Sequence, residues 1–300
     1  MSEKLGQLDI VFVVDNTGSM GPYINAVKVK ILEIIRTIKK EELVHRLRVG
    51  LVSYRDHPPE DESFVTKKYE LSPDTSSIEG YVKEMVAHGG GDGPEAVCDA
   101  LHVANRMEFL NESAKVVILI GDAPPHGVEP SGDNFPDGCP DGHNWEEESQ
   151  RAFDIGVVIH TVGCTPQINR YKSAIDAYKK IAENSKGNFF PLEKADLLVG
   201  LITGIAMEEI DKIGIQQSIL EELGASMEDL PDDVEVSPGK LAEIASKLRG
   251  KGVTKRAVRH SPAAASGLAD TVEAVEVEEA QIDEEDIKEA LRQLKSKSKD

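Results

Sequence analysis

Five consecutive apolar residues near the start of the chain, Ile10–Val14, end directly on an acidic residue, Asp15. A short apolar run rich in β-branched residues is typical of a strand that is buried on both faces, as in the middle of a parallel sheet. Two hydroxyl side chains, Thr17 and Ser19, follow on a glycine-containing turn. A carboxylate and two hydroxyls are hard oxygen ligands of the kind that Mg²⁺ and Mn²⁺ prefer. The alternative interpretation is an ordinary strand-to-helix turn in which Ser19 caps the helix.

Segments with strand and helix patterns alternate from this first strand to about residue 213, which is typical of a parallel sheet wrapped by helices. The further predicted strands are Leu47–Tyr54, Phe64–Leu71, Lys115–Gly121, Val157–Gly163 and Phe189–Phe190, and the predicted helices are Pro22–Glu42, Ser76–Ala87, Pro94–Met107, Trp145–Ile155, Arg170–Asn184 and Ala195–Ile213. The pattern predicts an α/β fold with a doubly wound, mostly parallel sheet and helices on both faces. Phe64–Leu71 is expected to be an edge strand and antiparallel.

Two further loops carry acidic side chains toward the expected ligand-binding edge of this sheet. The glycine-rich loop His88–Ala96 contains Asp92, and Asp122 directly follows the most apolar strand. In a doubly wound sheet, the first strand and the strand before Asp122 are expected to be neighbours at the switch point, where their loops share a crevice. Five residues would then supply oxygens to one cation and leave a sixth octahedral position open. They are Asp15, Thr17, Ser19, Asp92 and Asp122.

These three loops together resemble the von Willebrand factor type A domain over roughly residues 5–212. The sequence from Asp15 to Ser19 is similar to the DxSxS signature of that family, in a DxTGS form. Asp122 matches the aspartate of the third loop, and the glycine-rich loop places Asp92 where many members have threonine. The three loops are similar to the intracellular branch of the family, which includes A domains found beside atypical alpha kinases.

The resemblance implies a Rossmann-like fold with a metal-ion-dependent adhesion site that holds Mg²⁺ or Mn²⁺. It implies a protein-binding module rather than an enzyme, in which an acidic side chain of a protein partner completes the coordination of the metal. Two alternatives stay open. One is a metal-dependent hydrolase that acts on a phosphate or another anion in the same crevice, and the other is a scaffold with a vestigial site.

Charge and composition exclude several classes of partner. The formal net charge is −20, from 54 acidic and 34 basic side chains, which argues against nucleic acid and anionic membrane surfaces as partners. The sequence has no apolar run long enough for a membrane span, and its start lacks the apolar region of a secretory signal. Three scattered cysteines do not form a disulfide framework. We therefore expect a cytoplasmic protein, and the sequence does not indicate its oligomeric state.

The character of the chain changes near Gly214, which predicts a division into an A-type domain, residues 5–213, and an acidic tail, residues 214–300. The tail is expected to be largely disordered when alone, with helical islands at Ile215–Leu223, Pro238–Leu248 and Ile282–Lys295. Between them, Lys247–His260 is locally basic, which favours a solvated linker over a docking signal.

A second metal site is a weaker hypothesis for the long polar segment between Asp122 and the helix that begins at Trp145. His126, Cys139 and His143 could bind Zn²⁺, although their spacing matches no common zinc module. The favoured interpretation is an ordered loop beside the metal face that helps to select the partner. Asp56 follows a strand end and could support the site indirectly.

Overall fold

The computed structural model describes residues 6–40, 44–111, 113–192, 198–224, 237–262 and 272–297. Its main sheet has six strands in the order β3-β2-β1-β4-β5-β6. The strands are β1 (Gly6–Asp15), β2 (Val44–Tyr54), β3 (Thr66–Ser72), β4 (Ala114–Gly121), β5 (Val157–Cys164) and β6 (Phe189–Leu192). All neighbouring strands are parallel except β2 and β3, so the antiparallel edge strand is confirmed. The strand order reverses direction between β1 and β4, which makes this pair the switch point.

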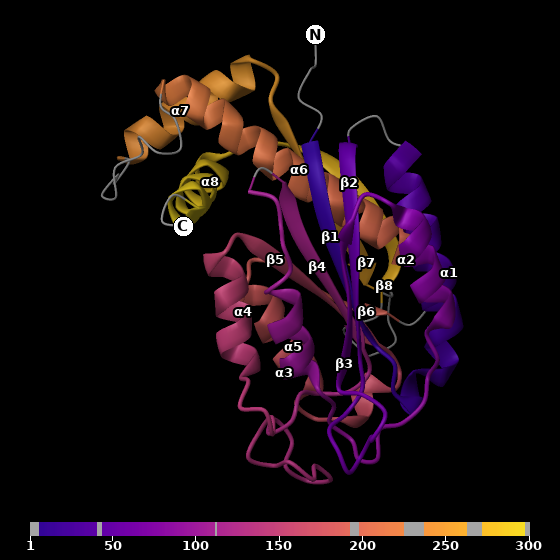
Figure 1. Ribbon diagram of the computed structural model, residues 1–300. Coiled ribbons are helices and arrows are strands. Elements are labelled where there is room, and N and C mark those ends of the chain that lie inside the picture. The colour runs from indigo at the N-terminus through magenta and orange to yellow at the C-terminus, as the bar shows by residue number, and fades with distance from the viewer. Residues whose placement is uncertain are drawn as a thin grey trace.

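The side chains of β1 alternate between two hydrophobic cores, as expected for a strand buried on both faces. Phe12 and Val14 belong to one core, and Val11 and Val13 belong to the other. The first face is covered by α1 (Gly21–Lys40), α2 (Thr75–Glu84) and α6 (Leu198–Leu223), and the second by α3 (Val97–Ala104), α4 (Trp145–Asp154) and α5 (Ala174–Asn184). Figure 1 shows these helices on both sides of the sheet, which confirms the predicted α/β fold. The loops at the carboxyl ends of the strands gather at the lower end of this view, far from the N-terminus.

Helix α6 is longer than predicted and continues through the expected domain boundary at residues 213 and 214. Ile213 packs against the main core, whereas Ile215 and Ile219 lie in a third hydrophobic core. The sequence placed the end of the helix at Ile213 because the next residue is glycine, a common helix terminator. Here packing on both sides of Gly214 keeps the helix continuous.

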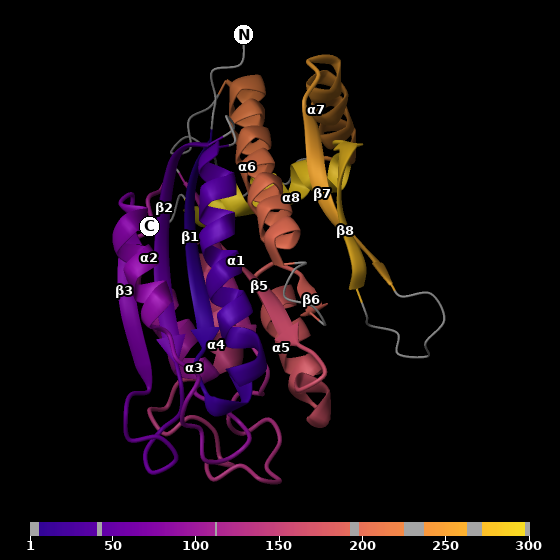
Figure 2. The same ribbon diagram turned by 90° about the vertical axis from the view of Figure 1, so that its right-hand side faces the viewer.

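The third core is formed by α6 with elements from the C-terminal part of the chain. These are α7 (Pro238–Gly250) and α8 (Glu284–Lys297). The antiparallel pair β7 (Thr254–Pro262) and β8 (Val272–Gln281) lies against α6 in the same part of the molecule. Figure 2 shows α7, β7 and β8 beside α6, on the side of α6 away from the main sheet. The helices α7 and α8 match the predicted helical islands. The strand pair was not predicted, and Lys247–His260 is the end of α7 and most of β7 rather than a linker.

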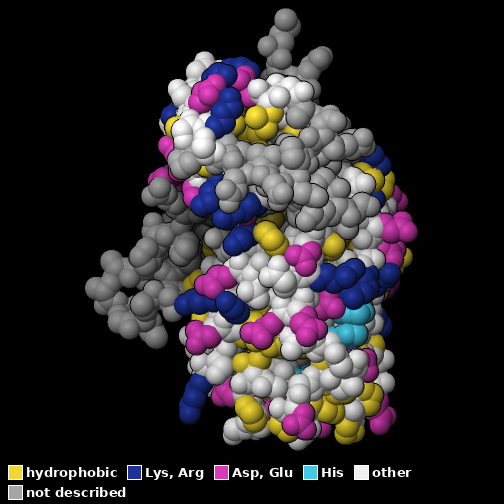
Figure 3. All heavy atoms as spheres, turned by 90° about the vertical axis from the view of Figure 1, so that its left-hand side faces the viewer, with side chains coloured by type: hydrophobic (Ala, Val, Ile, Leu, Met, Phe, Trp, Pro, Cys, Tyr) yellow, Lys and Arg dark blue, Asp and Glu magenta, His cyan; other side chains and the backbone are white. Residues whose placement is uncertain are grey.

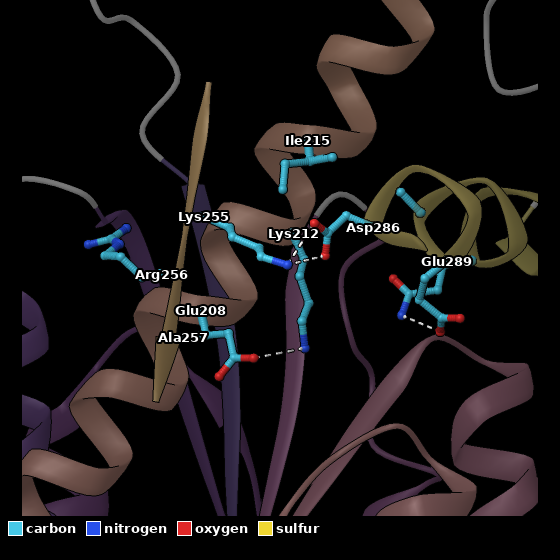
Figure 4. Close-up of a pocket in the computed structure, with 10 residues that line it drawn as sticks. Glu208, Lys212, Ile215, Lys255, Arg256, Ala257, Asp286 and Glu289 are labelled. Carbon is cyan, nitrogen blue, oxygen red and sulfur yellow. Dashed lines mark hydrogen bonds and ion pairs between the residues drawn. The ribbon is translucent and has the colours of Figure 1, made fainter. Parts of the chain in front are cut away.

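Polar contacts join the elements of this C-terminal unit to one another and to α6. Lys255 on β7 reaches Asp286 on α8, with Nζ 2.7 Å from both carboxylate oxygens. Asp211 on α6 accepts hydrogen bonds from the side chain and backbone of Arg256. Figure 4 shows the pocket between these elements, with Lys255 pointing toward Asp286 and with Glu208 paired to Lys212. Every helix in the described part of the chain is too short or too polar to cross a bilayer.

Candidate metal centre

The loop after β1 folds back on the carboxylate that ends the strand. Asp15 is fully buried, and its Oδ1 accepts hydrogen bonds from the backbone N of Thr17 at 2.8 Å and from Thr17 Oγ1 at 2.6 Å. Ser19 lies in a 3₁₀ turn, Gly18–Met20, and its Oγ is 3.1 Å from Thr17 Oγ1. The turn therefore brings both hydroxyls to the end of the strand, as the sequence predicted.

Asp122 completes a group of four predicted residues that the structure brings together. Ser19 Oγ donates a hydrogen bond to Asp122 Oδ1 at 2.8 Å across 103 positions of sequence. The contact follows from the sheet, because β1 and β4 pair in parallel with Val14 opposite Ile120. Parallel pairing in this register places the residues after both strands at the same edge.

These carboxylates lie in surroundings that disfavour negative charge. Burial and then the nearby charge of Asp122 raise the pKa of Asp15 to about 8, and burial raises the pKa of Asp122 to about 6. One oxygen of each, Oδ2, is buried and accepts no hydrogen bond within the described part of the chain. Buried acceptors without partners are costly, and acidic groups that repel each other are stabilised by a cation between them. The donor set therefore fits a hard divalent cation.

The glycine-rich loop is fixed to the β1 loop by its backbone. His88 N donates to Asn16 O, and Gly18 N donates to Gly89 O, both at 2.9 Å. A side chain at Gly18 would have its Cβ 3.1 Å from that same Gly89 oxygen, so the close approach favours glycine. The other end of the loop is tied to the third loop, because Glu95 N donates to Pro124 O at 2.9 Å. The three loops thus hold one another in place.

Glu95 is the residue of the glycine-rich loop whose carboxylate lies among these side chains, and the sequence pattern did not predict it. Its carboxylate lies beside Thr17, and burial followed by the charge of Asp15 raises the pKa of Glu95 well above its usual value. Its Oε2 is buried and has no hydrogen-bond partner among the described residues. One feature of the sequence could have pointed to Glu95: it stands just before the apolar start of α3, which indicates a buried position. We use "metal centre" below for Asp15, Thr17, Ser19, Glu95 and Asp122.

Asp92 lies in a neighbouring group of polar side chains. Its Oδ2 accepts a hydrogen bond from Asn134 N at 2.7 Å, and its carboxylate belongs to a cluster with Asp56 and His126. Burial raises the pKa of Asp92 to about 6. The structure thus brings Asp92 together with Asp56, His126 and Asn134 rather than with Thr17, so its role as a metal ligand stays a prediction.

His126 anchors the long segment between β4 and α4. Its Nε2 is 2.8 Å from Asp56 Oδ1, and its Nδ1 is 2.9 Å from Asp133 Oδ1. Burial works to lower the pKa of His126, but these two hydrogen bonds raise it above its usual value. The hypothetical zinc site of His126, Cys139 and His143 is not assembled, because Cys139 instead contacts His57 and Asp99. Asp56 does lie beside the crevice, as expected.

Comparison with known proteins identifies the family of the N-terminal part. Residues 9–129 match the family model described as von Willebrand factor A domain. The alpha-protein kinase vwkA of Dictyostelium discoideum is 34% identical over 137 residues, covering 45% of this chain and 22% of the kinase. The putative ariadne-like RING finger protein R811 of Acanthamoeba polyphaga mimivirus is 29% identical over 128 residues, covering 43% of this chain and 12% of that protein. This chain therefore matches less than a quarter of the length of either relative.

Solved structures show the same fold at low sequence identity. The open conformation of the pilus adhesin SpaC from Lactobacillus rhamnosus GG aligns with a TM-score of 0.52 and 17% identity, covering 70% of this chain and 31% of the adhesin. A von Willebrand factor type A structure from Catenulispora acidiphila aligns with a TM-score of 0.50 and 13% identity, covering 69% of this chain and 43% of that one.

Proposed function

We propose that this chain, which contains a von Willebrand factor A domain, binds a protein partner through a divalent cation at the metal centre. Proteins of this family are interaction modules. One observation carries the proposal: three buried carboxylate oxygens from three loops, on Asp15, Glu95 and Asp122, have no hydrogen-bond partner within the described residues. Two hydroxyls, on Thr17 and Ser19, lie among the same side chains.

Mg²⁺ or Mn²⁺ suits this donor set, because both cations take oxygen ligands in octahedral geometry. Asp15, Glu95 and Asp122 would balance the charge of the cation, and Thr17 and Ser19 would orient the carboxylates through the hydrogen bonds already described. A cation bound there would offer an open position to an oxygen of the partner. An acidic side chain fits best, since the cation provides local positive charge on a chain whose net charge is −20.

The first test is calorimetric titration of the full chain with Mg²⁺ and Mn²⁺. We expect one site per chain, and we expect Asp122→Asn and Glu95→Gln each to weaken binding at least about tenfold, since loss of an outer-shell partner alone costs that much. Asp176→Asn, on an exposed position of α5, is the matched control and should bind normally. If the native chain and Asp122→Asn bind Mg²⁺ and Mn²⁺ equally, the alternative of a scaffold with a vestigial site would explain the protein better.

Asp92→Asn tests which acidic residue of the glycine-rich loop contacts the cation. We expect it to keep most of the affinity that Glu95→Gln loses, because Asp92 lies with Asp56 and His126. The reverse order of effects would assign the ligand to Asp92, as the sequence alone suggested.

The second test separates binding from catalysis. Partner capture should occur in Mg²⁺ and be lost both in chelator and with Asp122→Asn. The hydrolase alternative predicts turnover of a generic phosphate ester that Asp15→Ala and Asp122→Ala abolish. Such turnover, together with partner capture that persists in both variants, would overturn the proposed binding role.

A further inference from the structure

A second group of metal-binding side chains lies apart from the metal centre, where α3 meets two loops. His57 comes from the turn after β2, Asp99 from the first turn of α3, and Cys139 from the segment between β4 and α4. His57 and Asp99 are 3% and 4% exposed, and Cys139 is half-buried. Asp99 stands four positions after Glu95 in the sequence, but its carboxylate contacts His57 and Cys139 instead.

The donor atoms of this group are as close together as the ligands of one zinc ion. Asp99 Oδ2 is 2.9 Å from His57 Nε2 and 3.2 Å from Cys139 Sγ, and Cys139 Sγ is 3.8 Å from His57 Nε2. Tetrahedral Zn²⁺ with ordinary bond lengths separates its nitrogen and oxygen ligands by about 3.4 Å, and its sulfur from either by about 3.6 Å. Small rotations of the side chains would therefore suffice to complete the geometry.

His143 lies beside Asp99, at the edge of this group. Its Nε2 is 3.8 Å from Oδ1 of Asp99, the second oxygen of the same carboxylate. Its ring stacks on that of His102 with 3.6 Å between centroids, and His102 Nδ1 in turn is 2.7 Å from Glu148 Oε1. His143 is half-buried, with its side chain 26% exposed. This partial exposure leaves the group open to a cation from solvent. Figure 3 shows that some histidine side chains reach the molecular surface.

We propose that His57, Asp99 and Cys139 bind Zn²⁺ and that His143 is the fourth ligand. A set with one thiolate and two imidazoles selects Zn²⁺ over Mg²⁺, because sulfur and nitrogen donors suit the softer ion and the metal centre offers oxygen alone. Four protein ligands close the coordination sphere, which is typical of a structural zinc site. This site is independent of the proposed binding function.

The zinc ion would fasten the long loop between β4 and α4 to the body of the domain. Cys139 and His143 belong to that loop, whereas His57 and Asp99 belong to the β2 turn and α3. Aromatic contacts already bring these parts together, since the ring of Phe135 packs edge-on against His57 with centroids 5.8 Å apart. A metal that closes such a loop removes conformational freedom from it. The same loop also contacts the glycine-rich loop, where Asn134 N donates a hydrogen bond to Asp92.

The first test is to strip the full chain of metal and titrate it with Zn²⁺ against a chromophoric chelator. We expect one tight site that Asp122→Asn retains, which would separate it from the metal centre. Cys139→Ser and His57→Gln should each weaken Zn²⁺ binding at least about tenfold. Cys164→Ala, which removes a buried thiol elsewhere, is the matched control and should bind normally.

Co²⁺ gives a second readout that does not depend on affinity. Co²⁺ in the site should show the intense ligand-field absorption of tetrahedral coordination and a thiolate charge-transfer band, and Cys139→Ser should lose that band. His143→Ala changes a half-buried side chain, so it should fold and yet bind Zn²⁺ more weakly. Unchanged affinity in His143→Ala would remove the fourth ligand from the proposal. An absent charge-transfer band, or equal Zn²⁺ binding by Cys139→Ser and the native chain, would overturn the site itself.

Limited proteolysis then tests the role of the ion. Zn²⁺ should protect the segment between β4 and α4 from cleavage in the native chain and in Asp122→Asn, and should give no protection in Cys139→Ser. Equal cleavage of the native chain with and without Zn²⁺ would refute the fastening role.

Discussion

Each carboxylate of the metal centre is partly satisfied by the chain and partly left without a partner. Asp15 Oδ1 accepts two hydrogen bonds from Thr17, and Asp122 Oδ1 accepts one from Ser19, whereas the Oδ2 atom of each accepts none within the described residues. The hydrogen-bonded oxygens fix the orientation of the side chains. The remaining oxygens keep their full capacity for a ligand, and the cost of burying them appears as a raised pKa.

The raised pKa of Asp15 predicts that the metal-free protein loses stability as the pH rises. Asp15 has a pKa near 3.8 when unfolded and about 8 when folded, so between these values the folded state holds a proton that the unfolded state does not. The contribution of Asp15 to the free energy of unfolding is therefore fully present below about pH 4 and is lost as the pH rises through about 8. In chelator, Asp15→Asn should therefore gain stability relative to the native chain between about pH 5 and about pH 8.

Thermal unfolding of both proteins at about pH 5 and at about pH 8 measures this effect. Asp176→Asn is the control for removing an exposed carboxylate. Saturating Mg²⁺ should reverse the order and favour the native chain at high pH, because only the native chain binds the ion fully. A constant difference between Asp15→Asn and the native chain across the pH range would contradict the raised pKa.

The residues of the metal centre differ in how far the sequence could predict them. Asp15 and Asp122 directly follow apolar strands, and the turn of Thr17 and Ser19 is local, so simple patterns were sufficient. Asp92 and Glu95 stand three positions apart in one glycine-rich loop, and sequence alone does not decide which carboxylate points inward. Contacts between loops decide it, among them the bond from Glu95 N to Pro124 O. The group of His57, Asp99 and Cys139 likewise depends on contacts between distant segments.

Among the secondary-structure elements, those with a strong apolar pattern were predicted best. The buried strands β1, β2, β4 and β5 and the helix α1 appear close to their expected positions. The pair β7 and β8 was missed because its apolar residues are few and small and stand among charged ones, as in the segment from Val275 to Glu279. Such strands depend on a partner strand and on α6 for their apolar contacts, and neither is visible in a local window.

The elements at the amino end of the sheet are joined by one buried ion pair. Asp9 on β1 is 1% exposed and accepts hydrogen bonds from Arg48 Nε on β2 at 2.8 Å, from Leu110 N at 2.8 Å and from Ser113 Oγ at 2.7 Å. One carboxylate thus connects two strands and the loop before β4. Removing it would leave the guanidinium of Arg48 buried without its counter-charge.

We predict that Asp9→Ala lowers the free energy of unfolding by about 3–5 kcal/mol, the usual cost of breaking a buried ion pair on one side. Chemical denaturation measures this change. Mg²⁺ affinity should stay close to that of the native chain, because Asp9 and Asp15 lie toward opposite ends of β1. Glu33→Ala, which breaks an exposed pair with Lys30, should change stability by less than about 1 kcal/mol. Loss of stability of similar size in both variants would argue against the role of Asp9.

The described residues of the molecule form three hydrophobic cores, and α6 is the element that joins the third to the main sheet. Two cores line the faces of the sheet, and the third is built from α6, α7, α8 and neighbouring residues. The third core is small, so it is expected to open more readily than the sheet. Because α6 runs through residue 213, the predicted division there holds only if the third core unfolds independently of the main sheet.

We predict that Ile219→Ala opens the C-terminal unit while the sheet stays folded. Ile219 is fully buried in the third core, and replacing a buried isoleucine with alanine costs about 2–5 kcal/mol. Hydrogen exchange followed by mass spectrometry should show faster exchange in α7 and α8 and unchanged protection in β1 and β4. The mirror variant is Ile31→Ala on α1, equally buried but in the main core, which should weaken protection in the sheet. If Ile219→Ala instead accelerates exchange equally in α8 and β1, the cores unfold as one unit and the division at residue 213 has no thermodynamic meaning.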